Sequence, residues 1–226
     1  MASIDPRVFA EKGCIGLEGF HPKARMASIR QSLLDGMKRA HVGKGIPPAI
    51  RSLPMFQQIA RLSALVQVPG LHASLVTPEL KEAITALGGQ APVSIQETQL
   101  LLSPRAQGNW SLQGLNWHVD VTADARGPIP GIQAFFLIDD VAPRGGATLA
   151  LAGSHRPGVD IPALRRLLKA STHLERDLQS LGIELIEMCG RAGDVFLMDM
   201  RLLHTPSINA TRELRMMATA RCFLQT

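Results

Sequence analysis

The sequence predicts a mainly β protein with flanking helices, in which N-terminal helices precede an antiparallel sandwich or barrel. Up to about residue 90, apolar residues recur at spacings of three and four, as they do on one face of a helix. From residue 93 onward, short apolar runs alternate with Gly, Pro, Asn and Asp, as strands alternate with turns. We therefore expect a single domain, 1–226, with a mostly helical support region over 1–90 and a β-core over 91–226.

The predicted helical region opens with a short helix, a Gly-punctuated strand at Cys14–Leu17 and a longer helix. An apolar stripe with helical spacing supports the longer helix. Its members are Ile29, Leu33, Leu34 and Met37. A Pro-rich stretch, 45–56, interrupts the pattern, which resumes over about 56–66.

The last helix of this region carries both a start and a stop signal. Pro78 lies in its first turn, where a missing N–H is tolerated. Gly88 and Gly89 follow its final apolar residues, as glycines often do where a helix ends. We expect the helix to occupy the segment "PELKEAITALGG".

The β-core is predicted from seven short runs bounded by turn residues. These runs are 93–103, 114–123, 131–142, 145–155, 182–189, 193–204 and 214–224. A segment between two of them, about 160–182, has helical character instead. The plainer interpretation of this insert is a solvated helix packed on the barrel through its apolar stripe, and the alternatives are a lid or a dimer surface. The stripe consists of Leu164, Leu167 and Leu168.

Composition places the chain among globular proteins. Its 226 residues suffice for one domain with a sizeable core, and apolar residues make up 46% and charged residues 19%. The net charge of +5 favours anionic molecules, but the charges are scattered and there are only two Trp and no Tyr to stack on bases. We therefore expect no nucleic-acid partner, whereas a pocket for carboxylates fits the positive balance.

The three cysteines, Cys14, Cys189 and Cys222, are an odd number at wide spacing, which argues against a disulfide framework or a zinc cluster. The segment "MASIDPRVFAEKG" has no leader pattern, and no apolar run approaches the length of a membrane span. We expect a cytoplasmic protein without a membrane partner, either a monomer or a homodimer.

The pattern His118-x-Asp120, together with His204 far downstream, is the main candidate for chemistry. Two imidazoles and one carboxylate can occupy one face of an Fe(II) ion and leave other positions open. On a strand, residues two apart point to the same side, so His118 and Asp120 would converge. The alternative is a buried, hydrogen-bonded histidine beside a turn aspartate, because chance produces His-x-Asp often.

Arg215 adds to this pattern, eleven positions after His204. An arginine deep in a β-core needs an anionic partner, because its charge cannot be shed. A dicarboxylic cosubstrate with one end on iron would supply that partner at its other end.

Three core segments and an opening segment extend the pattern over most of the chain. They are "QLLLSPRAQGNWSLQGLNWHVD", "IDDVAPRGGATLALAGSH" and "AGDVFLMDMRLLHTPSINATRELR", preceded by "FAEKGCIGLEGFHPK". In this order and spacing, they resemble the phytanoyl-CoA dioxygenase-like family of Fe(II)/2-oxoglutarate-dependent oxygenases. The resemblance implies a double-stranded β-helix, a jelly-roll, cupin-like fold, in agreement with the strand pattern.

The resemblance also implies roles for particular residues. It assigns His118, Asp120 and His204 as the catalytic iron ligands, and Arg215 as the partner of the distal carboxylate of 2-oxoglutarate. The implied cosubstrates are 2-oxoglutarate and O2, and the implied products include succinate and CO2. Pro206 departs from the family, which often has a small polar residue there, and Ser207 follows one position later.

Several predicted strand residues are further candidates for the pocket, since about half of them face inward by parity. We expect Thr148, Gln99 and Ser207 to contact 2-oxoglutarate. For the substrate, we expect contacts from Asn116, Trp117, Gln133 and Phe135. Two of these have a competing explanation, because Phe135 could simply pack in the core and alternation points Trp117 away from His118.

The expected function is hydroxylation of a C–H bond in a small molecule, either amino acid-like or a secondary-metabolite intermediate; desaturation or ring closure would use the same site. Because Asp120 is present, the site is not expected to be that of a halogenase. The alternatives are an inactive jelly-roll binding protein and a cupin-type isomerase or hydrolase with another metal. Dependence on 2-oxoglutarate separates these possibilities.

Overall fold

The structure is a computed structural model that describes residues 4–42 and 46–225. Two of the features used above lie partly outside these residues, namely Gly45 of the Pro-rich stretch and the first three residues of the segment without a leader pattern. The described helices are α1 Pro6–Lys12, α2 Lys23–Arg39, α3 Pro48–Arg51, α4 Met55–Ala64, α5 Leu71–Leu75, α6 Pro78–Gly88, α7 Ile161–Ala170 and α8 Leu174–Ser180. The described strands are β1 Cys14–Leu17, β2 Ser94–Ile95, β3 Gln99–Ser103, β4 Gly131–Leu137, β5 Thr148–Ala152, β6 Glu184–Glu187, β7 Val195–Asp199, β8 His204–Pro206 and β9 Arg215–Phe223.

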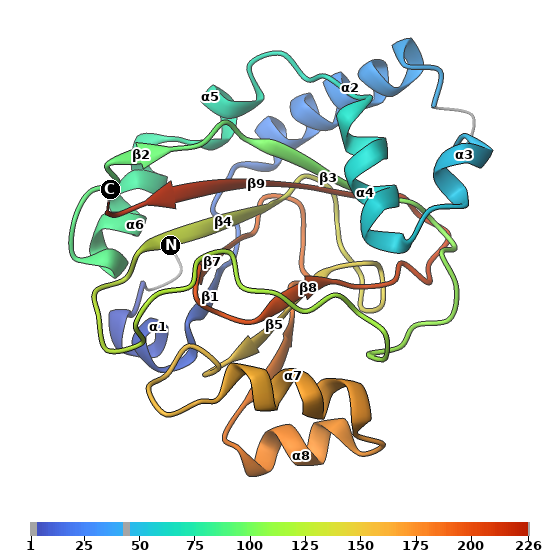
Figure 1. Ribbon diagram of the computed structural model, residues 1–226. Coiled ribbons are helices and arrows are strands. Elements are labelled where there is room, and N and C mark those ends of the chain that lie inside the picture. Colours follow the sequence, from blue (N-terminus) through green and yellow to red (C-terminus); the bar gives the residue numbers. More distant parts are fainter. Residues whose placement is uncertain (1–3, 43–45, 226) are drawn as a thin grey trace.

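Two antiparallel sheets form the core (Figure 1). The larger sheet has the order β1-β7-β4-β9-β2, with β3 also paired to β9, and the smaller sheet has the order β6-β5-β8. Helices α2, α5 and α6 lie along the larger sheet, and α7 and α8 lie beside the smaller one (Figure 1). The prediction of a mainly β protein built on a double-stranded β-helix with flanking helices is confirmed.

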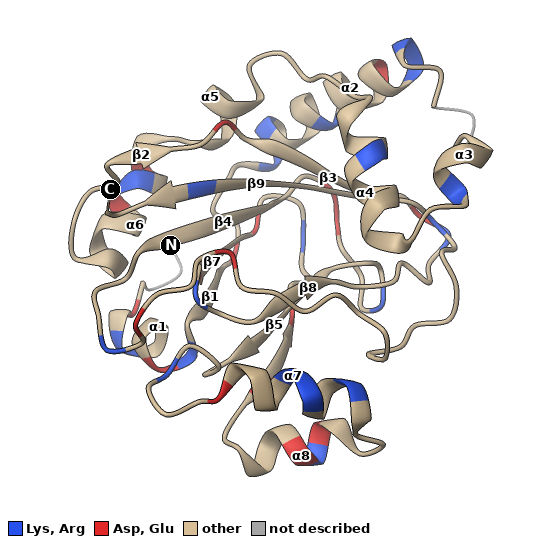
Figure 2. Cartoon of the chain, in the orientation of Figure 1, with Lys and Arg blue, Asp and Glu red and all other residues tan. Residues whose placement is uncertain are grey.

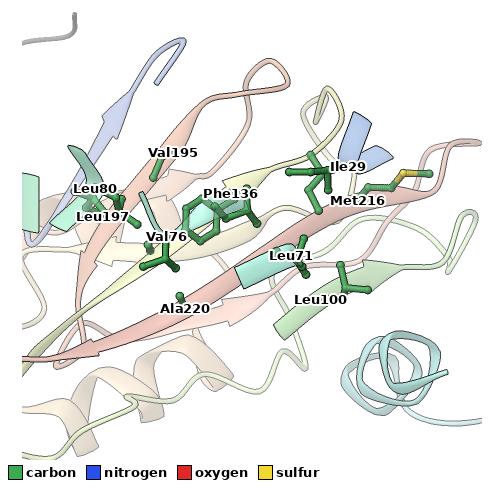
Figure 3. Packing of buried hydrophobic residues seen from close by; sticks show 14 of the residues in the cluster. Ile29, Leu71, Val76, Leu80, Leu100, Phe136, Val195, Leu197, Met216 and Ala220 are labelled. Carbon is green, nitrogen blue, oxygen red and sulfur yellow. The ribbon is translucent and has the colours of Figure 1, made fainter. Parts of the chain in front are cut away.

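The helices cover one face of the larger sheet and leave its other face for the interior between the sheets. On β9, the even-numbered residues from Met216 to Cys222 join the helices in a single apolar cluster (Figure 3). The members of β4 in this cluster are Ile132, Ala134 and Phe136. Because side chains alternate along a strand, the odd-numbered residues of β4 and β9 face the other way, toward the smaller sheet.

The N-terminal elements agree with the sequence. The predicted helix, strand and longer helix are α1, β1 and α2, and the predicted last helix is α6. Asp5 accepts bonds from two N–H groups at the start of α1, and Gly13 ends the helix with φ 73°. A Cβ at Gly13 would approach Leu202 and His155 closer than 3.0 Å, so this turn has no room for a side chain.

The run 114–123 is not a strand, contrary to the prediction. His118 instead forms an isolated bridge with His204. The N–H groups of Asp120 and Val121 both donate to the carbonyl of Met200, at 3.1 Å each. Two consecutive donors on one carbonyl cannot continue a ladder, because neighbouring residues of a strand bond in opposite directions.

The run 193–204 is also not one strand. Strand β7 ends at Asp199, and His204 opens β8 in the other sheet rather than closing β7. Asp199 accepts bonds from the backbone N–H of Arg201 at 2.9 Å and from its guanidinium at 3.1 and 2.7 Å. This buried pair closes the turn that carries the chain from one sheet to the other.

The helical insert forms two helices, α7 and α8, in place of the one expected. Leu164 and Leu168 are buried against Leu149 and Leu151 of the smaller sheet. The insert therefore packs on the barrel, as in the plainer interpretation.

Charge and hydropathy add two observations. Lys, Arg, Asp and Glu are spread over helices and loops (Figure 2), in agreement with the scattered charges of the sequence. Within the described ranges, no helix combines the length and the apolar character needed to cross a membrane.

Candidate metal and cosubstrate site

His118, Asp120 and His204 converge at the mouth of the interior between the sheets. The backbones of the two histidines exchange N–H to carbonyl bonds of 2.9 Å in each direction, and their ring centroids lie 4.3 Å apart. One ligand atom from each of the three residues lies within 4.8 Å of the others. Parity therefore placed His118 and Asp120 on one side, although a single bridge replaces the expected strand.

The two imidazoles are oriented as metal ligands would be. Nδ1 of His118 bonds to the carbonyl of Asn116 at 3.0 Å, and Nδ1 of His204 bonds to the carbonyl of Leu202 at 3.1 Å. A carbonyl only accepts, so each Nδ1 carries a proton, and in the neutral form of each ring Nε2 has a free lone pair. Burial, with the neighbouring His118, lowers the pKa of His204 to about 4, so this imidazole is neutral at neutral pH. The donor set fits a divalent metal.

Arg221 holds Asp120 through both carboxylate oxygens. Its Nε lies 3.2 Å from Oδ2 and its Nη2 lies 3.1 Å from Oδ1. Oδ2 of Asp120 is also 3.8 Å from Nε2 of His204. The sequence analysis did not single out Arg221, although its even spacing from Arg215 on a predicted strand was a signal that both face the same side.

Arg215 is a buried cation without a carboxylate partner among the described residues. It lies on β9 opposite Ser103 and is 3% exposed. Its Nη1 contacts Sδ of Met217 at 3.0 Å, and its Nε has no partner. Burial lowers the pKa of its guanidinium to about 9, which reflects the cost of a desolvated charge. A ligand anion would relieve this cost.

A cavity of about 630 Å³ joins Arg215 to the histidines. From the β-core its lining includes Gln99, Leu101, His118, Gln133, Phe135, Thr148, His204, Pro206, Arg215, Thr219 and Arg221. The other wall comes from α4 and the segment that leads to α5, and includes Phe56, Ile59, Ala60, Ala64 and Val68. This second wall was not predicted, because 1–90 was interpreted as a support region only.

Four of the seven additional candidates line the cavity, namely Gln99, Thr148, Gln133 and Phe135. The other three are placed elsewhere. Ser207 is fully buried and donates its hydroxyl to the carbonyl of Ala147 at 2.8 Å. The side chain of Asn116 is exposed, and only its carbonyl takes part, through His118. Trp117 packs in the apolar cluster beneath α7, as strand-like alternation away from His118 requires.

The side-chain amide of Gln133 has a fixed orientation at the cavity wall. Its Nε2 donates to Oγ1 of Thr219 at 2.9 Å, and this hydroxyl donates to the carbonyl of Ala134 at 2.8 Å. Because the hydroxyl proton is used on Ala134, Gln133 must present its NH2 to Thr219 and its Oε1 elsewhere. That oxygen is buried and has no partner among the described residues, so the wall of the cavity contains an unsatisfied acceptor.

The comparisons with known proteins agree with this architecture. AviO1 from Streptomyces viridochromogenes Tue57 matches with a TM-score of 0.65 and 16% identity, over 99% of this chain and 97% of AviO1. The carbocyclase SnoK from nogalamycin biosynthesis, described as non-heme and alpha ketoglutarate dependent, has a TM-score of 0.66 and 17% identity, over 99% and 84%. EctD from S. alaskensis, solved with 2-oxoglutarate and 5-hydroxyectoine, has a TM-score of 0.66 and 17% identity, over 99% and 77%.

At these identities the solved structures show the shared fold alone. No curated protein matches the sequence. The sequence pattern of one family, however, covers residues 9–217, which is most of the chain. The chain belongs to the phytanoyl-CoA dioxygenase (PhyH) family.

Proposed function

We propose that this protein is a non-haem Fe(II)/2-oxoglutarate-dependent dioxygenase that hydroxylates a C–H bond of a small molecule. The observation that carries the proposal is the pairing of two features in one cavity. One is the cluster of His118, Asp120 and His204, and the other is the buried guanidinium of Arg215, which has no carboxylate partner in the described part of the chain. A metal alone would use the first feature, whereas a dicarboxylate bound to that metal would use both.

In this proposal the chain positions and shields the reactants. His118, Asp120 and His204 would hold Fe(II), and Arg215 would bind the distal carboxylate of 2-oxoglutarate, with Thr148 and Gln99 beside it. When bound, iron with 2-oxoglutarate and O2 supplies the oxidising chemistry, with release of succinate and CO2. The apolar residues of α4 would limit access of water from the opposite side.

The cavity also bears on the substrate. Its α4 wall is mostly apolar, and its β-core wall contains Phe135 and the buried Oε1 of Gln133, which has no partner among the described residues. A substrate with an apolar body and an O–H or N–H group would satisfy both walls. Such a description suits a secondary-metabolite intermediate or an amino acid-like molecule.

Ring closure would be a second outcome of the same site; the similar structure SnoK is described as a carbocyclase, whereas EctD was solved with 5-hydroxyectoine. The same residues would hold metal and cosubstrate in either case. Analysis of the product formed from an identified substrate separates the two, since hydroxylation adds an oxygen atom and ring closure removes two hydrogens.

An anaerobic titration of the metal-free protein with Fe(II) and 2-oxoglutarate tests the proposal. We expect a weak visible charge-transfer band that requires both additions and is missing in His204→Ala. A folded wild-type protein without this band would contradict the proposal and favour a binding protein. Metal binding that is indifferent to 2-oxoglutarate would favour a cupin-type metal enzyme instead.

A further inference from the structure

Arg221 pairs with Asp120 and lines the same cavity as the two histidines, and the proposed reaction gives it no role so far. We infer that Arg221 is a positioning residue that orients Asp120 and sets the charge of the metal site, so that metal and 2-oxoglutarate bind cooperatively. The inference rests on the proposed function, because it concerns the same metal and cosubstrate.

The contact between Arg221 and Asp120 is a two-pronged one. Nε and Nη2 each bond to a different carboxylate oxygen, at 3.2 and 3.1 Å. Such a fork fixes the plane of the carboxylate more firmly than a single bond would. Each oxygen keeps a second lone pair, and Oδ2 is the oxygen nearer to His204. Asp120 is therefore oriented toward the imidazoles before any metal arrives.

The same contact changes the charge of the ligand set. A metal binds imidazoles in their neutral form, so the formal charge of the ligand set is that of Asp120, which is paired with Arg221. The side chain of Asp120 is only 8% exposed, so solvent screens this balance weakly. A divalent cation thus meets a ligand set with no net charge, which holds it less firmly than an anionic set would.

The cosubstrate supplies the missing negative charge. 2-Oxoglutarate carries two carboxylates, and Arg215 is placed to pair with one of them. The other would bind the metal, and Arg221 lines the same cavity. A cation at that position repels the metal and attracts the carboxylate, so each ligand strengthens the binding of the other.

Two effects of Arg221 on metal binding oppose each other. The fork favours binding because it fixes Asp120 before the metal binds. This gain is small, because an aspartate side chain has little entropy to lose. The guanidinium charge disfavours binding, and the Coulomb energy is doubled because the metal is divalent. We therefore expect the charge to dominate, so that removing Arg221 tightens the binding of metal alone.

The test is a titration of the metal-free protein with Mn(II), followed by the electron paramagnetic resonance of free Mn(II). For Arg221→Met, we expect Mn(II) alone to bind about tenfold more tightly than to wild type. We expect 2-oxoglutarate to bind the Mn(II)-loaded variant about tenfold more weakly, by calorimetry. Arg30→Met is the matched control, because Arg30 forms an exposed pair with Asp139 and does not line this cavity.

Arg221→Lys separates charge from orientation and guards against a misfolded variant. Lys keeps the charge and loses the fork. We expect its Mn(II) affinity to stay near that of wild type, while the visible spectrum of bound Co(II) changes because Asp120 is free to rotate.

Three results would overturn the inference. Arg221→Met could bind both ligands more weakly, which would mean that Arg221 has a structural role only. It could bind both as wild type does, or Arg221→Lys could behave like Arg221→Met. The proposed function fails separately, if wild-type protein binds no metal or binds metal without any effect of 2-oxoglutarate.

Discussion

At the scale of single residues, the cavity is marked by polar atoms that lack partners within the described part of the chain. Nε of Arg215 is an unused donor, and Oε1 of Gln133 is an unused acceptor. Buried polar atoms usually find partners, because an unsatisfied one costs about 1–3 kcal/mol. These two atoms therefore indicate which ligand groups complete the site: an anion at Arg215 and a hydrogen-bond donor at Gln133.

Arg215→Ala tests whether Arg215 binds a carboxylate of 2-oxoglutarate. We expect 2-oxoglutarate binding to the metal-loaded protein to weaken at least about tenfold, because a charge-assisted, bidentate contact is lost. Metal binding in the absence of 2-oxoglutarate should stay nearly unchanged, as measured by Mn(II) titration. Equal loss of both affinities would mean that Arg215 supports the fold rather than the cosubstrate.

Gln133→Met tests whether a ligand donates a hydrogen bond to Oε1 of Gln133. We expect wild type to bind phenol more tightly than anisole, by a few-fold, because only phenol can donate to Oε1. Gln133→Met should bind the two probes alike, in saturation-transfer NMR at matched concentrations. The variant Gln133→Glu is the counterpart, and should strengthen the preference for phenol. If Gln133→Met still preferred phenol to the same extent, phenol would be donating its hydrogen bond to a different residue.

At the scale of elements, the turn after β7 decides where the second histidine lies. The buried pair of Asp199 and Arg201 closes this turn, and Arg201 also donates to the carbonyls of Asp124 and Gly127 at 3.0 and 3.1 Å. The turn thus joins β7, the loop after Asp120 and the start of β8. It moves the chain to the smaller sheet, where His204 can bridge to His118.

Asp199→Ala should be strongly destabilising, because it leaves the guanidinium of Arg201 buried without its counter-charge. We expect the free energy of unfolding to fall by about 3–5 kcal/mol, as for other broken buried pairs. Glu184→Ala is the control, since Glu184 pairs with Lys12 on the surface and such pairs contribute at most about 1 kcal/mol. Urea unfolding of both variants checks this, and similar small losses would show that the turn is stable without the pair.

At the scale of the whole molecule, the cavity exists only because an N-terminal helix closes one side of a C-terminal β-core. Helix α4 packs on β3, and the hydroxyl of Ser63 accepts the N–H of Leu102 at 2.8 Å. Helices α7 and α8 lie on the far side of the smaller sheet (Figure 1). Among the described residues that line the cavity, none belongs to that insert.

Ala60→Trp tests whether α4 shapes the substrate part of the cavity and leaves the cosubstrate part, at Arg215 and the histidines, unaffected. The larger side chain would narrow the space beside α4, whereas Arg215 and the histidines lie on the opposite wall. We expect the charge-transfer band with Fe(II) and 2-oxoglutarate to remain, and binding of phenol to weaken by about tenfold or more. Ala49→Trp on α3 is the control, because Ala49 is exposed and outside the lining. Loss of the band in Ala60→Trp would mean that α4 also shapes the cosubstrate site.

The sequence by itself determined the division into N-terminal helices and a C-terminal β-core, the pairing of His118 with Asp120 and the candidacy of Arg215, because these follow from short-range periodicity and from the chemistry of single residues. Tertiary structure decided the rest. The sheet switch before His204, the fork of Arg221 on Asp120 and the wall from α4 all join residues far apart in the chain. Local pattern cannot specify such contacts, since they depend on how the chain crosses between two packed layers.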